Sequence, residues 1–158
     1  MCEAAWKYTH GKQLILDGTF SICNSKVLLF ICMGVDAENK GVPLSFFLFS
    51  APTGNRATQA GYNISVLKRL LEEWRKSLGT REGSSFAPRV AITDTNTKER
   101  GALFSVWPTV WLLLCKFHVR QCWTNRRKAV LKLGQNPTFP KLQVQACLRA
   151  LEEQYVPS

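Results

Sequence analysis

The stretch Leu14-Ile-Leu-Asp-Gly-Thr-Phe20 is the first of three successive β-rich runs that decide the fold. The second run is Lys26-Val-Leu-Leu-Phe-Ile-Cys-Met-Gly-Val35, and the third covers residues 42–50. Turn-forming residues at 36–41 separate the last two runs, so these runs are predicted to form a hairpin. A short polar link at 23–25 favours antiparallel pairing of the first two. The sequence therefore predicts an antiparallel meander of three strands.

A helical pattern follows the meander. Apolar residues recur at spacings of three and four, as on one face of an amphipathic helix: Ile64, Leu67, Leu71, Trp74 and Leu78. Gly79 is a natural end for this helix, because glycine readily adopts the conformation that terminates one.

The rest of the chain alternates strands with helices. Short strands are expected over 89–94 and 110–115, with a short helix over 98–106 between them; further helices are expected over 117–133 and about 140–154. The order β-β-β-α-β-α-β-α-α predicts an α/β fold with a mixed five-stranded sheet. Three strands would be antiparallel and the last two parallel, with helices on the faces of the sheet and a C-terminal helical extension.

The charge balance favours an anionic partner. Lys and Arg number 21 against 11 Asp and Glu, a net charge of +10, which points to nucleic acid ahead of an acidic membrane. No acid lies between Glu99 and Glu152, so the C-terminal third is locally cationic. Its candidate phosphate contacts are Arg120, Arg126, Arg127 and Lys128. A solvated helix face explains the same cluster.

Length and cysteine content bound the class of protein. The 158 residues suit one domain. We expect a core over residues 1–134, and the start of a truncated helical region over 135–158. Six cysteines without a dense framework, and no cleavable hydrophobic leader, favour an intracellular protein that is not secreted. The apolar runs are too short to span a bilayer, so no membrane partner is expected.

Two aspartates are candidates for a metal site. Asp17 interrupts an apolar strand, where a carboxylate is costly to bury unless it is paired or bound to a cation. Asp94 ends a later strand. If the two strands are neighbours about 4.8 Å apart, both carboxylates could converge on Mg²⁺, which prefers hard oxygen ligands. Two such ions could activate a water or a 3′-hydroxyl at a phosphodiester. The alternatives are a bulge residue at 17 and a helix cap at 94.

The segment Cys115-Lys-Phe-His118 has three interpretations. Cys122 lies four residues further on, and a zinc site using all three would still lack a fourth ligand, so zinc is not expected. A buried Cys115 beside a hydrogen-bonded His118 is a second interpretation. In the third, His118 lies beside the acidic site and contacts phosphate or a reacting water.

Four motifs, in this order and at these spacings, resemble the catalytic domain of Mutator-like-element (MULE) transposases, which belong to the wider group that uses an Asp-Asp-Glu triad. They are residues 14–20, residues 34–36 running into Lys40-Gly-Val-Pro-Leu44, Val90-Ala-Ile-Thr-Asp94, and Leu113-Leu-Cys-Lys-Phe-His118. The resemblance covers about residues 12–125 and implies a ribonuclease H-like fold.

The resemblance also implies a site and a reaction. Asp17 and Asp94 match the first two catalytic acids, and Cys115 and His118 match a Cys-x-x-His motif near the active site. The family cuts DNA at element ends and joins the 3′ ends to target DNA with Mg²⁺ or Mn²⁺. DNA as partner, nuclear residence and a homo-oligomer in the intact family are expected, without a small-molecule cofactor.

The chain departs from the family at the third acid, a downstream Glu. Glu153 is only a weak candidate, so the third acid is unknown and the two-metal site is expected to be incomplete. The expectation is a truncated, transposase-derived domain that is inactive in isolation. The alternative is a non-catalytic module that binds nucleic acid or protein.

Overall fold

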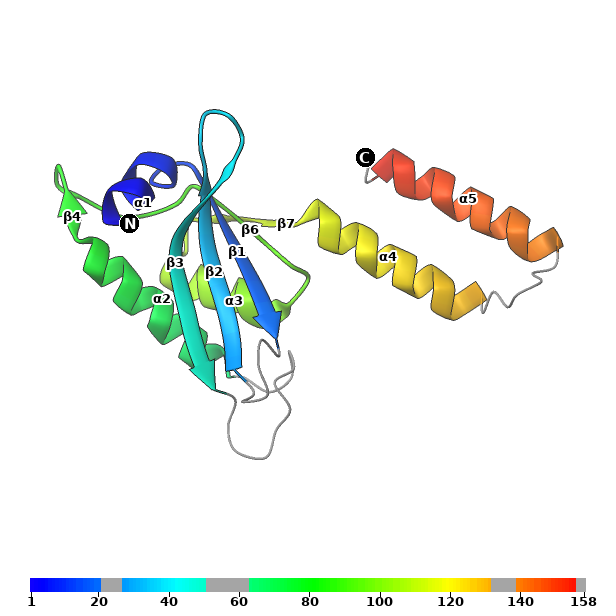
Figure 1. Ribbon diagram of the computed structural model, residues 1–158, viewed down its shortest axis with the longest axis horizontal. Helices are drawn as coiled ribbons and strands as arrows, with labels where there is room; N and C mark the ends of the chain where they lie inside the picture. The colour runs from blue at the N-terminus through cyan, green and yellow to red at the C-terminus, as the bar shows by residue number, and fades with distance from the viewer. Residues whose placement is uncertain (21–26, 51–62, 132–138, 156–158) are drawn as a thin grey trace. The chain divides into compact units, whose positions relative to one another are not determined.

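A computed structural model describes residues 1–20, 27–50, 63–131 and 139–155 (Figure 1). Its elements, in chain order, are α1 (Cys2–Tyr8), β1 (Gln13–Phe20), β2 (Val27–Val35), β3 (Gly41–Ser50), α2 (Ile64–Leu78), β4 (Thr80–Arg81), β5 (Ser84–Ser85), β6 (Val90–Thr93), α3 (Thr97–Val106), β7 (Trp111–Leu114), α4 (Lys116–Leu131) and α5 (Phe139–Tyr155). They group into two compact units, Met1–Leu113 and Leu114–Ser158. The domain boundary predicted between residues 134 and 135 lies outside the described residues.

The sheet has the predicted mixed architecture, with the strand order β3-β2-β1-β6-β7. β2 pairs antiparallel with both β1 and β3, and β1 pairs parallel with β6. The backbone N–H of Trp111 donates to the carbonyl of Arg89 at 3.0 Å, so β7 and β6 begin at the same edge. The five-stranded mixed sheet expected from the sequence is confirmed.

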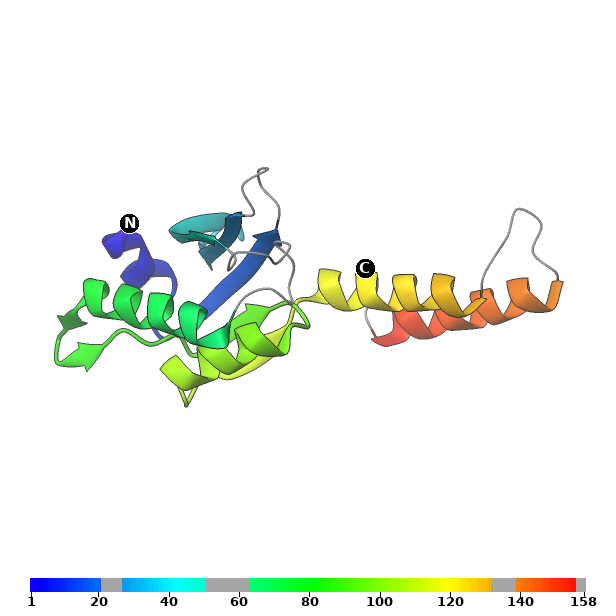
Figure 2. The same ribbon diagram turned by 90° about the horizontal axis from the view of Figure 1, so that it is seen from below.

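One face of the sheet carries the core of the first unit. Residues alternate along β2, with Leu28, Phe30 and Cys32 fully buried and the intervening residues half-buried. The buried face packs against α2 and α3, which lie on the same side of the sheet (Figure 2). Each fully buried apolar side chain contributes about 1.5–3 kcal/mol, so this alternation fixes which face the helices cover.

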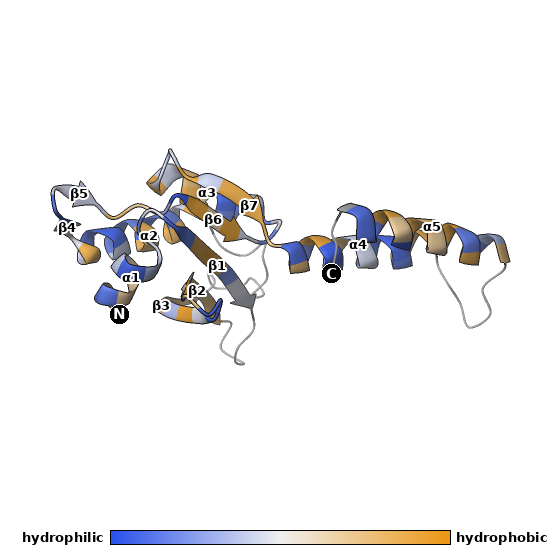
Figure 3. Ribbon diagram, turned by 90° about the horizontal axis from the view of Figure 1, so that it is seen from above, coloured by the Kyte–Doolittle hydropathy of each residue, from blue (hydrophilic) through white to orange (hydrophobic). Residues whose placement is uncertain are grey.

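The opposite face is left open by α1, α2 and α3. On it, Phe46 and Leu48 of β3 are 51% and 62% exposed. β6 and β7 carry mainly apolar residues (Figure 3). In the first unit, α2 and α3 therefore cover one face of the sheet, and the other face carries both half-buried and exposed side chains.

The predicted helix over 64–78 is confirmed. α2 buries Leu67, Leu71, Trp74 and Leu78 and ends at Gly79, whose φ is 69°. Its N-terminus is capped by the side chain of Asn63, which accepts a hydrogen bond from the N–H of Ser65 at 3.1 Å. The helix predicted at 98–106 is also present, as α3.

Two elements were missed by the sequence analysis. α1 has seven residues, too few to be stable on propensity alone. It is held by burial of Ala5 and by the indole of Trp6, which donates to the Leu78 carbonyl at 3.0 Å. The β4–β5 hairpin is equally short, and turns through Glu82 and Gly83, both at positive φ.

The second unit consists of α4 and α5, which agree with the helices predicted over 117–133 and 140–154. Charged pairs join the two helices: Arg127 contacts Glu152 at 2.5 Å, and Arg120 contacts Glu153 at 2.6 Å. The predicted end of the first helix, at Gly134, lies outside the described residues. Across the described segments, no helix combines the length and apolarity needed to cross a membrane.

Candidate functional site

The two predicted acids lie on neighbouring strands. β1 and β6 pair in parallel register, with Ile15 opposite Ile92. Continuing that register by two residues brings Asp17 opposite Asp94, where β6 has just ended. Because side chains two residues apart share a face of a strand, both acids follow the face that carries Ile15 and Ile92. Asp17 is half-buried, and Asp94 is 7% exposed.

A third carboxyl, which the sequence analysis did not single out, joins this pair. Glu99 in the first turn of α3 is fully buried, although it is charged in isolation. The hydroxyl of Thr93 donates to Glu99 Oε2, and no donor from the described part of the chain reaches the buried Glu99 Oε1. A Cβ placed on Gly18 would lie 3.1 Å from Oε1. The same Cβ would lie 2.8 Å from Cε1 of Phe30, so glycine at position 18 relieves crowding with the Phe30 ring first and with this carboxyl second.

The local cap explains why Glu99 turns inward. Asn96 is the N-cap of α3, and Glu99 is at the N3 position, where a Glu commonly reaches back to the N-cap N–H. Here the N–H of Asn96 donates instead to Asp94 Oδ1 at 2.6 Å, and the Asn96 side chain caps Lys98 N at 2.9 Å. The predicted helix cap at Asp94 is thus wrong: Asn96 is the N-cap of α3, and Asp94 accepts a hydrogen bond from the N–H of that cap residue.

The pKa of Glu99 is affected by both Asp17 and Asp94. Burial raises the pKa of Glu99 to about 8 from the usual 4.5, against the lowering effect of the Thr93 hydrogen bond. The charge of Asp94, a hydrogen bond with the Asp94 side chain and the charge of Asp17 also raise this pKa. Like charges gathered at a poorly solvated site favour the protonated form of one of them. Residues 17, 94 and 99 thus form what we call the acid cluster.

The acid cluster is not a formed coordination shell. Within the described ranges, no group of three or more His, Cys, Asp or Glu side chains is arranged to hold a metal ion. Glu99 comes from the face covered by α3, beside Gly18, whereas Asp17 follows the opposite face of β1. The carboxyls reach the end of β6 from two sides.

The Cys-x-x-His motif lies where the second unit begins. Cys115 directly precedes α4, and its carbonyl accepts from the N–H of Val119 at 3.0 Å. Cys115 and His118 are half-buried, while Cys122 is exposed. The ring of Phe117 packs edge-on against His118 at 5.3 Å. A role for His118 at the acid cluster stays a prediction.

The predicted phosphate contacts divide into two kinds. Arg120 and Arg127 pair with Glu153 and Glu152 respectively. Arg126 and Lys128 are exposed on α4. The carboxylate of Glu153, the weak candidate for the third acid, is thus engaged by a guanidinium in the second unit.

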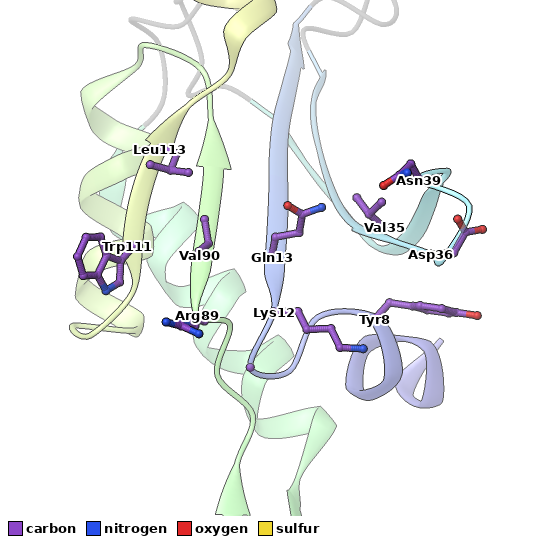
Figure 4. Close-up of a pocket in the computed structure, with 11 residues that line it drawn as sticks. Tyr8, Lys12, Gln13, Val35, Asp36, Asn39, Arg89, Val90, Trp111 and Leu113 are labelled. Atoms are coloured by element: carbon purple, nitrogen blue, oxygen red, sulfur yellow. The ribbon is translucent and has the colours of Figure 1, made fainter.

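A pocket of about 620 Å³ opens on the first unit at the other end of β1 and β6, where the strands begin (Figure 4). Gln13 and Val90 line it, so it lies well away from Asp17 and Asp94. Its lining includes two cationic and two aromatic side chains. The acid cluster and this pocket are separate sites on one sheet.

The comparison with protein families agrees with the arrangement of motifs. The model of the MULE transposase domain matches residues 13–122, which include β1, β6, α3 and the Cys-x-x-His motif. No curated protein matches the chain. Since the match covers more than half of the 158 residues, the chain belongs to the MULE transposase domain family.

Proposed function

We propose that this chain is a transposase-derived domain of ribonuclease H-like fold whose acid cluster binds Mg²⁺ or Mn²⁺ and acts on the phosphodiester bonds of DNA. The observation that carries the proposal is the parallel register of β1 and β6, which leads Asp17 and Asp94 to the same place in the sheet. The strand order β3-β2-β1-β6-β7, with an antiparallel meander preceding parallel strands, supports the ribonuclease H-like assignment.

The donor chemistry of the acid cluster fits a hard divalent cation. All three side chains offer carboxylate oxygens, the ligands that Mg²⁺ prefers. Among the described residues, no donor reaches Oε1 of buried Glu99, so this oxygen could accept a cation. When bound, the metal would supply positive charge to stabilise the attacking and leaving oxygens of a phosphodiester.

The residues of the chain have distinct parts in this proposal. Asp17 and Asp94 provide negative charge at the strand end, and the N–H of Asn96 fixes one oxygen of Asp94. Glu99 gives up its proton to complete the set, and the hydroxyl of Thr93 orients its other oxygen. The third carboxylate thus comes from α3, five residues after the second, in place of the downstream Glu of the family.

This assignment alters the expectation of inactivity. The expectation of inactivity depends on a missing third acid, and Glu99 is a third carboxyl beside Asp17 and Asp94. We propose that the acid cluster can nick DNA, whereas joining of element ends requires the complete transposase in its oligomeric form. DNA is then the partner and the nucleus the place of action.

The test is manganese-dependent nicking of supercoiled plasmid DNA above pH 8, where Glu99 is ionised. We expect nicking by the wild-type chain and its loss in Asp17→Asn, Asp94→Asn and Glu99→Gln. Glu38→Gln is the matched control, because Glu38 is an exposed acid in the β2–β3 turn. Nicking that persists in both aspartate variants would rule out this site.

A second candidate function is a non-catalytic nucleic-acid-binding module. The exposure of Arg126 and Lys128 on α4 favours it, because exposed cations contact phosphates in a salt-dependent way. Salt-sensitive DNA binding that survives Asp17→Asn and Asp94→Asn, with no nicking by the wild-type chain, is the result that selects this alternative.

A further inference from the structure

The pocket at the start of the strands has the chemistry of a nucleotide-binding surface. Seven of its lining residues are polar, charged or aromatic: Tyr8, Lys12, Gln13, Asp36, Asn39, Arg89 and Trp111. In Figure 4 their side chains lie on the side of the sheet away from α2 and α3. The indole of Trp111 is 71% exposed, an unusual placement for a large aromatic ring.

Backbone hydrogen bonds hold three of these residues in a row across three strands. The carbonyl of Lys12 accepts from the N–H of Arg89 at 2.8 Å and from that of Val90 at 3.0 Å. The carbonyl of Arg89 in turn accepts from the N–H of Trp111 at 3.0 Å. Lys12 and Arg89, which directly precede β1 and β6, and Trp111, the first residue of β7, are therefore backbone neighbours at one edge of the sheet.

The other charged groups that line the pocket leave Lys12 and Arg89 able to contact an anionic ligand. The ammonium of Lys12 has three N–H donors. One of them donates to the Lys7 carbonyl at 2.8 Å. The acid of the pocket, Asp36, lies at the opposite end from Trp111 (Figure 4). One of its oxygens accepts from the N–H groups of Glu38 and Lys40 in its own turn.

The pocket and Asp17 share one face of β1. Residues Gln13, Ile15 and Asp17 alternate onto the same side of the strand. Four residues at about 3.3 Å each separate Gln13 from Asp17 by about 13 Å. A DNA strand that crosses the open face could thus reach both sites.

We propose that this pocket binds an unpaired stretch of the DNA strand, with phosphates on Lys12 and Arg89 and a base stacked on Trp111. The proposal rests on the proposed function, because it takes DNA as the partner. The guanidinium matches the geometry of a phosphate, and stacking on an indole accepts any base. Stacking needs an exposed base face, so the occupant is single-stranded and not duplex DNA.

The experiment is a fluorescence-anisotropy titration of a labelled oligothymidylate in EDTA, over a series of NaCl concentrations. Trp111→Ala is expected to weaken binding about tenfold, or about 1.4 kcal/mol, while Trp111→Phe restores most of it. Lys12→Gln and Arg89→Gln should each lower the log–log salt slope by about 0.7, the value for one phosphate contact on a single strand.

Matched controls come from the covered side of the sheet. Phe104 is an aromatic residue of α3 that is 54% exposed, and Lys76 is an exposed cation of α2. Phe104→Ala and Lys76→Gln should leave the affinity within twofold of the wild type. Circular dichroism of each variant checks that it is folded.

The pocket assignment fails if Trp111→Ala binds the oligonucleotide as tightly as Phe104→Ala does, or if duplex DNA shows the same dependence on Trp111. This test of the pocket is independent of metal binding at the acid cluster, because the titration contains EDTA and no metal. Asp17→Asn is expected to keep oligonucleotide binding while losing nicking. Intact nicking with binding insensitive to Trp111 would count against the pocket alone.

Discussion

Glu99 is the residue on which the site depends most. Its carboxyl has no exposed surface; one oxygen accepts from the Thr93 hydroxyl, and the other meets no donor among residues 1–20, 27–50, 63–131 and 139–155. A buried, unsatisfied carboxyl costs free energy and is commonly retained for a function. Its neighbours Asp17 and Asp94 raise that cost by charge repulsion.

The raised pKa of Glu99 makes stability depend on pH in a defined direction. Its folded-state pKa of about 8 lies above the usual 4.5, so the folded chain binds the proton more tightly than the unfolded chain. The stabilisation is full below about pH 4.5 and is lost as pH rises through about 8. Without metal, the free energy of unfolding should therefore fall between pH 5 and pH 8.

Glu99→Gln removes that dependence, because the amide keeps the shape of the side chain and cannot ionise. We expect the variant to be more stable than the wild type at pH 9 and similar to it at pH 5. Urea denaturation in EDTA at the two pH values measures both. A wild-type chain whose stability rises over this range by the same amount as the variant's would contradict the buried-acid assignment.

At the scale of elements, the start of α3 organises the acid cluster. Its Asn96 cap and the bond from Asn96 N to Asp94 set the first turn, and Glu99 lies in that turn. α2 has a comparable cap, since Asn63 accepts from Ser65 N, but it carries no residue of the cluster. The two caps form a matched pair for mutation.

Asn96→Ala and Asn63→Ala should each lower the free energy of unfolding by about 1 kcal/mol, the usual cost of losing an N-cap. Only Asn96→Ala should also weaken Mn²⁺ binding, by about tenfold, because it frays the turn that positions Glu99. Thermal unfolding and calorimetric titration separate the two effects. Equal manganese affinities in the two variants would show that the cap of α3 does not support the cluster.

The elements also show what sequence reasoning can reach. Period-two alternation in β2 and the 3–4 spacing in α2 are repeated signals, so strands, helix and mixed sheet were predicted correctly. α1 carries no such repeat, because tertiary contacts of Ala5 and Trp6 hold it. Which face of the sheet α2 and α3 cover in the first unit depends on tertiary packing, so the sequence does not predict it.

For the whole molecule, the site could be predicted only in part. Asp17 and Asp94 stand out in sequence because each interrupts or ends an apolar strand. Glu99 does not, because a Glu at N3 of a helix is ordinary capping chemistry. The Glu99 side chain turns inward because the N–H of Asn96 donates to Asp94 instead of to Glu99, and the sequence does not predict that choice of acceptor.

The family match and the sheet register bear on one question, namely whether three carboxyls from β1, the end of β6 and α3 act as one metal site. Calorimetric titration of the full chain with Mn²⁺ above pH 8 addresses it directly. We expect saturable binding by the wild type, weakened at least about tenfold in Asp17→Asn, Asp94→Asn and Glu99→Gln. Glu38→Gln and Glu153→Gln should bind as the wild type does. Unchanged manganese affinity in Asp17→Asn and Asp94→Asn would contradict the account.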